Sequence, residues 1–400
     1  MSAAPAAVLG NLVRPEVQLL LACARATISQ ENQSRVRSLI GEGIDWEYVL
    51  RIGVRNRVLP LVHRNLSSAA PNLVPSPVRE RMGEICKGIA GRGMFITARA
   101  IILLRRLSEA GISAILYKGP ALASLAYGHV TLREYGDVDI LVRPRDARGA
   151  ADVLEALGFR TDLHLSPPQE RLHLALHSEF IFHHPVSHEM VELHWRLCDG
   201  FFCFRPNYQS LWQNAKQGRV LGQPVLELSP EDLVLFLCVH GAQHCWDCLE
   251  WVCSLSHVVD GNPKLDWGRL GLLARSCGAS RMLLLGLSLA RDLFQCALPD
   301  GMRAELDRDV SIRGLSQDVC SRLFGEGSAT PHILLSHVFH LAARERLRDR
   351  IEYGLRLAFT PTPEDWKYVK GAPASFHFPL RFFRLGARAL SRRWRKSPAE

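Results

Sequence analysis

Two aspartates one residue apart carry the clearest chemistry in this 400-residue sequence. Asp137 and Asp139 open the run 137–142, whose apolar residues predict a β-strand. Alternate side chains of a strand point to the same face, so we expect both carboxylates on one face and Val138 on the other. Neighbouring carboxylates repel each other, and hard cations such as Mg²⁺ prefer oxygen ligands. The pair therefore predicts a metal site, although two solvated aspartates at a strand end would show the same short pattern.

Residues ahead of the aspartates suggest a phosphate site. The run 116–120 is typical of a strand end, a turn at Gly119 and the start of a helix, and helix N-termini bind phosphate through backbone N–H groups. Lys118 precedes the glycine. Arg133 lies four residues before the first aspartate, where it could add a cation for triphosphate oxygens. Pro120 has neither an N–H group nor a hydroxyl to offer, which leaves the contribution of the turn open.

A later strand offers a third carboxylate. Glu192 and His194 share one face of the predicted strand 190–197, and the opposite face is apolar, with Val191, Leu193 and Trp195. Glu192 could therefore join the two aspartates. Because the neighbouring aspartates repel each other, we expect Asp139→Asn to leave the metal-free protein at least as stable as before.

A second group of metal-ligand types follows at His240, His244, Cys245 and Cys248. On one predicted helix, the two histidines are four residues apart and share a face, a spacing that can bind Zn²⁺. The two cysteines would be rotated away from that face, so all four side chains could not converge on one ion. Packing against the domain that carries the aspartates is therefore favoured over metal binding.

The elements that position these residues suggest a mostly helical protein of the α+β class. Residues 1–110 are expected to be helical, residues 111–228 to form a small unit of strand, helix, strand, helix and hairpin, and residues 229–360 to form four or five helices. A loop and a basic, aromatic tail at 361–400 complete the chain. The chain is long enough, and at 47% hydrophobic residues apolar enough, to bury the cores of two or three domains.

The sequence also indicates the cellular compartment of the protein. We find neither a secretory signal nor an apolar run of the roughly 18 to 20 residues that a membrane-spanning helix requires. Eleven cysteines without an export signal indicate reduced thiols and no structural disulfide. We therefore expect a soluble cytoplasmic protein.

The net charge of +9 is concentrated in the tail. Residues 376–400 contain six arginines and Lys396 against Glu400 alone, and several aromatic side chains lie among them. Such a segment could contact an anionic membrane surface or nucleic acid. Packing of the aromatic side chains on the body of the protein is the favoured alternative, because they are numerous enough to need burial.

The motifs together resemble a family of bacterial nucleotidyltransferase-like proteins in the DNA-polymerase-β superfamily. In that family a KG turn, an LR pair, a DxD strand and a later ELHW strand follow in this order, and here they match Lys118-Gly119, Leu132-Arg133, Asp137 to Val142 and Glu192 to Trp195. The similarity extends to flanking positions, among them Asp45-Trp46, Asn56-Arg57-Val58, Ser229-Pro230-Glu231-Asp232, His240 and His244.

The resemblance implies a polymerase-β-like core, a short mixed sheet with flanking helices, between helical regions. It implies transfer of a nucleoside monophosphate from an NTP such as ATP to an acceptor, with two Mg²⁺ or Mn²⁺ ions. Asp137 and Asp139 would hold the metals, and Glu192 would hold the ion on the side of the nucleophile. Nucleotide-binding residues would be Lys118, Gly119, Arg133 and His194.

The acceptor is left open: a small molecule, a protein or an RNA. A non-catalytic nucleotide-binding protein, or an accessory protein of a biosynthetic pathway, is the other class that fits. Three retained carboxylates favour the enzyme, because a protein that only binds has no need to keep groups that repel one another.

Overall fold

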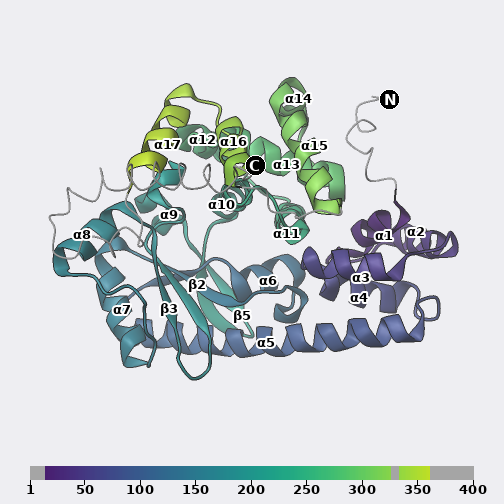
Figure 1. The fold of residues 1–400 in the computed structure, drawn as a ribbon, viewed down its shortest axis with the longest axis horizontal. Helices are drawn as coiled ribbons and strands as arrows, with labels where there is room; N and C mark the ends of the chain where they lie inside the picture. The colour runs from purple at the N-terminus through teal and green to yellow at the C-terminus, as the bar shows by residue number, and fades with distance from the viewer. Residues whose placement is uncertain (1–13, 326–332, 361–400) are drawn as a thin grey trace, which may run out of the picture.

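The computed structural model describes residues 14–325 and 333–360. Four short helices come first: α1 (Pro15–Cys23), α2 (Gln30–Gly41), α3 (Trp46–Arg55) and α4 (Leu59–Ala69). The 34-residue helix α5 (Ser76–Glu109) then runs along one side of the molecule, beneath both these helices and the sheet (Figure 1). Because α5 contacts α4 at one end and β1 and β2 at the other, it fixes the N-terminal helices relative to the sheet.

A six-stranded mixed sheet forms the centre of the fold. Its spatial order is β3 (Glu179–His183), β4 (Met190–His194), β2 (Asp137–Val142), β1 (Ala114–Leu116), β6 (Gln223–Glu227) and β5 (Lys216–Val220). β2 pairs in parallel with β4 and antiparallel with β1. The predicted α+β class is confirmed, since a small mixed sheet lies within a mostly helical chain. The β5–β6 hairpin, which meets β1 in parallel through β6, was not expected from the sequence.

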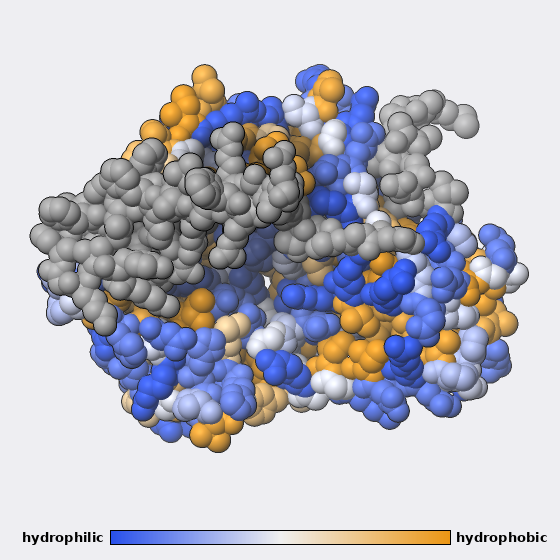
Figure 2. Space-filling model, viewed as in Figure 1, coloured by the Kyte–Doolittle hydropathy of each residue, from blue (hydrophilic) through white to orange (hydrophobic). Residues whose placement is uncertain are grey.

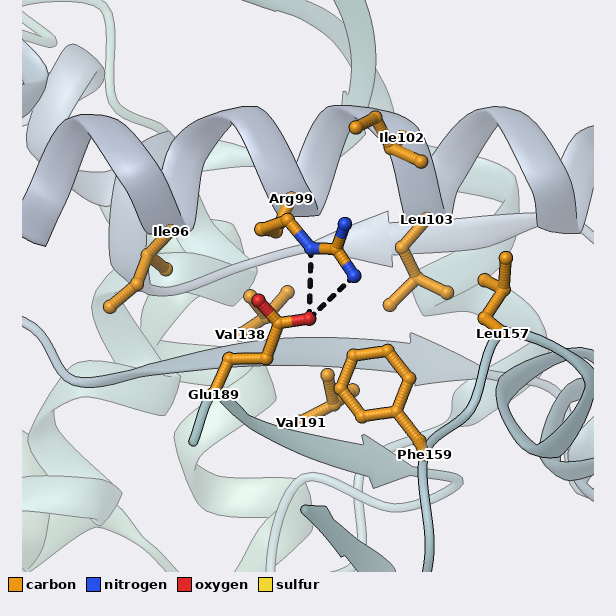
Figure 3. Close-up of a pocket in the computed structure, with 9 residues that line it drawn as sticks. All are labelled: Ile96, Arg99, Ile102, Leu103, Val138, Leu157, Phe159, Glu189 and Val191. Carbon is orange, nitrogen blue, oxygen red and sulfur yellow. Dashed lines mark hydrogen bonds and ion pairs between the residues drawn. The ribbon is translucent and has the colours of Figure 1, made fainter. Parts of the chain in front are cut away.

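The two faces of the sheet pack against different helices. Val138 of β2 and Val191 of β4 face α5, where Arg99 of the helix pairs with Glu189 just before β4 (Figure 3). This side encloses a cavity of only about 40 Å³ that is otherwise lined by apolar side chains. The opposite face, which carries Asp139 and Glu192, is directed at the C-terminal helices. The alternation expected for both strands is therefore present.

Shorter elements connect the strands. Helix α6 (Gly119–Tyr127) and a 3₁₀ turn (Val130–Leu132) lie between β1 and β2, and α7 (Ala147–Ala156) and α8 (Pro167–Leu176) lead from β2 to β3. Two more 3₁₀ turns (Pro144–Asp146 and Gly200–Phe202) and α9 (Tyr208–Asn214) complete this region. Helix α6 contacts both β2 and α11 of the C-terminal region, so it lies between the sheet and the C-terminal helices.

The C-terminal region contains eight helices between residues 230 and 360 of the described chain, where four or five were expected. They are α10 (Pro230–Gln243), α11 (Leu249–Asp260), α12 (Trp267–Cys277), α13 (Ser280–Phe294), α14 (Asp300–Arg308), α15 (Val310–Phe324), α16 (Ile333–Ala342) and α17 (Leu347–Phe359). The expected number was too low because left-handed residues such as Gly278 and Gln295 end helices inside stretches that remain apolar.

Helices α16 and α17 leave large apolar side chains in solvent. Figure 2 shows orange residues at the upper left edge of the molecule, where α17 lies in Figure 1. Leu347, Ile351 and Leu355 are spaced by four residues and are each at least 55% exposed. The basic tail that follows lies outside the described residues, so its expected packing stays a prediction, as do the domain limits. No helix in the described ranges is long and apolar enough to cross a membrane.

Candidate active site

Asp139 and Glu192 lie directly opposite each other in the register of the parallel strands β2 and β4. Their carboxylate oxygens and a ring nitrogen of His194 all lie within 4.8 Å of one another. His194 Nε2 is 3.4 Å from Asp139 Oδ1 and 3.3 Å from Glu192 Oε2. Within the described ranges these three residues are the one group whose ligand atoms could hold a metal ion. Two strands distant in sequence thus build one acidic centre.

A cavity of about 630 Å³ opens in front of this centre. Its lining includes five of the residues expected at the site: Lys118, Arg133, Asp137, Asp139 and Glu192. The N-terminal helices add Arg57, Gly88, Ile89 and Arg92, and the region of α10 and α11 adds His240, His244, Asp247 and Trp251. Gly119 and His194 are not among the lining residues. All three regions of the chain therefore meet at this cavity.

Lys118 neutralises the buried carboxylate of Asp139. Its Nζ lies 2.7 Å from Asp139 Oδ1, and only 3% of Asp139 is exposed. Burial alone would raise the pKa of Asp139, but the charges of Lys118 and His194 hold that pKa below its ordinary value. Burial likewise lowers the pKa of Lys118, while Asp139 and Glu192 raise it above the usual range. The pair is ionised, so a divalent cation at Asp139 must compete with the ammonium.

Asp137 has a different environment on the same strand face. Burial raises its pKa, and the charges of Asp139 and Glu192 raise it further, to about 6. It lines the cavity but lies outside the group formed by Asp139, Glu192 and His194. Of the three carboxylates, the charged form of Asp137 would therefore be stabilised most by a cation in the cavity.

His194 is positioned by Glu179 of the neighbouring strand β3. Its Nδ1 lies 2.9 Å from Glu179 Oε2 of β3, the residue opposite it in the antiparallel register. Burial lowers the pKa of His194, but the carboxylates of Asp139, Glu179 and Glu192 raise it well above its ordinary value. The structure thus places Glu179 behind His194.

Gly119 is required by the backbone between β1 and α6. Its φ is +51°, a left-handed conformation that favours glycine, and a Cβ atom there would lie 3.6 Å from the carbonyl oxygen of Asp137. The turn therefore brings the N-terminus of α6 against the start of β2. Binding of phosphate at this turn remains a prediction.

Arg133 is not the free cation that its position suggested. Its Nε lies 2.7 Å from Glu250 Oε1 and its Nη2 3.1 Å from Glu250 Oε2, so the guanidinium makes a two-pronged ion pair in the interior. Burial lowers the pKa of Arg133, and Glu250 raises it above the ordinary value. Glu250 was missed in the sequence, where the only signal is a single acid among the apolar residues at the start of α11; in the structure it is 1% exposed. The pair ties Arg133, which lies between the 3₁₀ turn Val130–Leu132 and β2, to the C-terminal helices.

The expected single helix through His240 and Cys248 is wrong. Helix α10 ends at Gln243, and Cys245 and Trp246 both have positive φ, so the chain turns before α11. Cys245 Sγ lies 3.6 Å from His340 Nε2, and Cys248 Sγ donates to the carbonyl of Asn56. The cysteines therefore pack elsewhere. His240 and His244 contact Trp251 at the cavity wall, with ring centroids 5.1 and 5.2 Å apart.

The acidic side chains fit hard divalent cations. Asp137, Asp139 and Glu192 offer carboxylate oxygens, the ligands that Mg²⁺ and Mn²⁺ prefer, and they face a cavity that solvent can enter. Lys118 and His194 supply the balancing charge in the metal-free protein. The residues present therefore suit a metal-dependent centre.

Comparison with known proteins defines the class. A family model described as "Uncharacterised nucleotidyltransferase" matches residues 42–295, well over half of the chain, so the protein belongs to this nucleotidyltransferase family. No curated protein matches the sequence. A solution structure of the antibiotic-resistance factor ANT(2'')-Ia is similar, with 16% identity over 53% of this chain and 92% of that chain and a TM-score of 0.27. The family and the mixed sheet together support a nucleotidyltransferase fold, the class expected from the sequence motifs.

Proposed function

We propose that the protein transfers a nucleoside monophosphate from an NTP to an acceptor hydroxyl in the cavity in front of β2 and β4. The observation that carries the proposal is the pairing of Asp139 with Glu192 across adjacent strands, at a cavity that Asp137 also lines. A protein that only bound nucleotide would have no need to bring three carboxylates together, because they repel one another.

The reaction exchanges one phosphorus–oxygen bond for another. The acceptor oxygen forms a bond to the α-phosphorus of the NTP, the bond from that phosphorus to the β-phosphate oxygen breaks, and pyrophosphate leaves. Asp137, Asp139 and Glu192 would hold Mg²⁺ or Mn²⁺, which would supply charge neutralisation for the phosphates and for the attacking oxygen. Glu192, which is partly exposed at the cavity, takes up the proton of the acceptor hydroxyl.

Other residues orient the reacting groups. Lys118 lies beside Asp139 and lines the cavity, where its ammonium would neutralise charge on a phosphate oxygen. His194 buttresses Glu192 from behind and is itself held by Glu179. Arg133 and Glu250 keep the sheet and α11 in fixed positions on either side of the cavity.

Transfer of label tests the proposal. Each NTP, labelled at the α-phosphate, would be incubated with the purified protein, Mg²⁺ or Mn²⁺ and a fractionated cell extract. Incorporation of label into one fraction, with release of pyrophosphate, is the expected result. Glu192→Gln should reduce incorporation by about 10²- to 10³-fold without unfolding the protein. Binding of NTP without incorporation from any of the four nucleotides would support a non-catalytic protein instead.

A further inference from the structure

Four cationic side chains line the cavity, and three of them are already engaged. Lys118 pairs with Asp139, and Arg133 pairs with Glu250. Arg92 donates from Nη2 to the carbonyl oxygen of Gly136 at 2.9 Å. Arg57 is exposed and, within the described ranges, its guanidinium has no hydrogen bond or ion pair. Glu134 of the same cavity lies near enough for the charge of Arg57 to act on its pKa, but the two form no ion pair, so the Arg57 guanidinium can meet a ligand with several negative oxygens.

The backbone at Arg57 is held in a conformation that arginine rarely adopts. Its φ is +54°, and the bonds from Arg57 N to Val54 O and from Val58 N to Gly53 O form a Schellman motif at the end of α3. The left-handed position of this motif is usually glycine, because a Cβ atom makes it unfavourable. Since strained backbone clusters at functional sites, an arginine here indicates a need for its side chain.

Buried contacts of the preceding residue fix this turn to the active-site wall. Asn56, which is fully buried, accepts at Oδ1 from Leu249 N at 3.0 Å, and its carbonyl accepts from Glu250 N at 3.2 Å. Its Nδ2 donates to the carbonyl of Leu323 at 3.2 Å. Glu250 is the partner of Arg133, so one network of buried contacts sets both arginines relative to the cavity.

We infer that Arg57 binds the leaving part of the substrate, the β- and γ-phosphates that depart as pyrophosphate. This inference rests on the proposed function and names a residue that acts in it. An unpaired guanidinium presents parallel N–H donors that match phosphate oxygens, and its charge would oppose the build-up of negative charge on the leaving group. The N-terminal helices thus contribute directly to the site through the turn between α3 and α4.

Substitution by glycine separates the side chain from the turn. Arg57→Gly removes the guanidinium and places a residue suited to a positive φ, so the melting temperature should hold or rise. Calorimetric titration with Mg²⁺–pyrophosphate should show binding at least tenfold weaker than in the unchanged protein. Arg57→Asn, another residue that tolerates this backbone, should lose the same affinity, and Arg57→Lys should retain part of it.

Two matched controls complete the design. Leu221→Gly removes the strain of a left-handed backbone, at φ +48°, from a leucine in the β5–β6 hairpin that does not line the cavity. Arg51→Gln removes an exposed charge from α3, again outside the lining. Both should bind Mg²⁺–pyrophosphate like the unchanged protein.

The outcomes separate this inference from the proposed function. Equal pyrophosphate affinity in the unchanged, Arg57→Gly and Arg57→Asn proteins would overturn the role of Arg57, even if label transfer succeeds. A large fall in melting temperature in both variants would also overturn it, because Arg57 would then serve the fold. Failure of label transfer in the unchanged protein counts against the proposed function alone, since the pyrophosphate titrations still report on Arg57.

Discussion

Lys118 Nζ lies 2.7 Å from Asp139 Oδ1, and this ion pair reverses the expected effect of removing the aspartate. From the sequence, two neighbouring carboxylates suggested that loss of either would relieve repulsion. The Asp139 side chain is 4% exposed and that of Lys118 is 15% exposed, so loss of the Asp139 charge leaves a largely buried ammonium without its partner. Burial, and after it the charges of Asp139 and Glu192, raises the pKa of Asp137 to about 6, so the unfavourable charge lies on Asp137 instead.

The two aspartates should therefore respond to substitution with opposite signs. In metal-free buffer at pH 8, Asp139→Asn should lower the free energy of unfolding by about 2–4 kcal/mol. Asp137→Asn should raise it by about 1–2 kcal/mol, because the charged form of Asp137 is disfavoured in the folded state. The gain should disappear as the pH falls below the ordinary pKa of aspartate, where the carboxyl is protonated in both states. Urea denaturation with EDTA measures both, and a shift of the same sign in both variants would contradict the assignment.

The pair between Arg133 and Glu250 should behave as a buried structural link. Arg133→Met should lower the free energy of unfolding by about 3–5 kcal/mol, since it leaves the Glu250 carboxylate in the interior without its counter-charge. Adding Glu250→Gln should restore at least half of the loss. Chemical denaturation of the two single variants and the double variant gives the coupling. If Arg133→Met were as stable as the unchanged protein but bound NTP more weakly, Arg133 would instead contact phosphate directly, as first expected.

Arg99 and Glu189 offer a matched pair on the other face of the sheet (Figure 3). Arg99 Nη2 lies 2.6 Å from Glu189 Oε1, and the Glu189 side chain is 3% exposed while that of Arg99 is 34% exposed. Arg99→Met should cost about 1–3 kcal/mol of stability, and Glu189→Gln in the same chain should recover much of it. Label transfer by the double variant should stay within about twofold of normal, because neither side chain lines the active-site cavity. A much larger loss of transfer in a folded variant would show that this face is coupled to catalysis.

His257 should make the fold sensitive to mild acid. Its Nε2 accepts from the backbone N–H of Ala26 at 3.0 Å, and burial lowers its pKa to about 4. The folded state therefore keeps this ring neutral while the unfolded state takes up a proton, so stability is full above pH 6.5 and falls between pH 6.5 and 4. The contribution of this group over that window should be about 2–3 kcal/mol. Denaturation at several pH values should show a shallower fall for His257→Gln, and equal slopes would exclude His257 as a source.

Strand periodicity predicted correctly which face of the sheet carries the acidic side chains. The alternation around Asp137 and Asp139 was enough to place both on one face with Val138 opposite, and the same reasoning placed Glu192 and His194 together. These relations are local, because the geometry of an extended backbone sets them whatever the strand later packs against. The α+β class followed for the same reason, since strand and helix periods differ within short windows.

Only the tertiary structure decided which charges meet. Arg133 and Glu250 are 117 residues apart, and Lys118 and Asp139 are 21 apart. No local pattern marks such partners, because their contact depends on how separately formed elements pack. The same holds for Arg57, whose left-handed backbone arises where α3 ends and whose position depends on the buried contacts of Asn56 with α11. Residue types and spacing determined the candidate carboxylates, whereas packing between distant elements determined which cations neutralise them and which one remains open to a substrate.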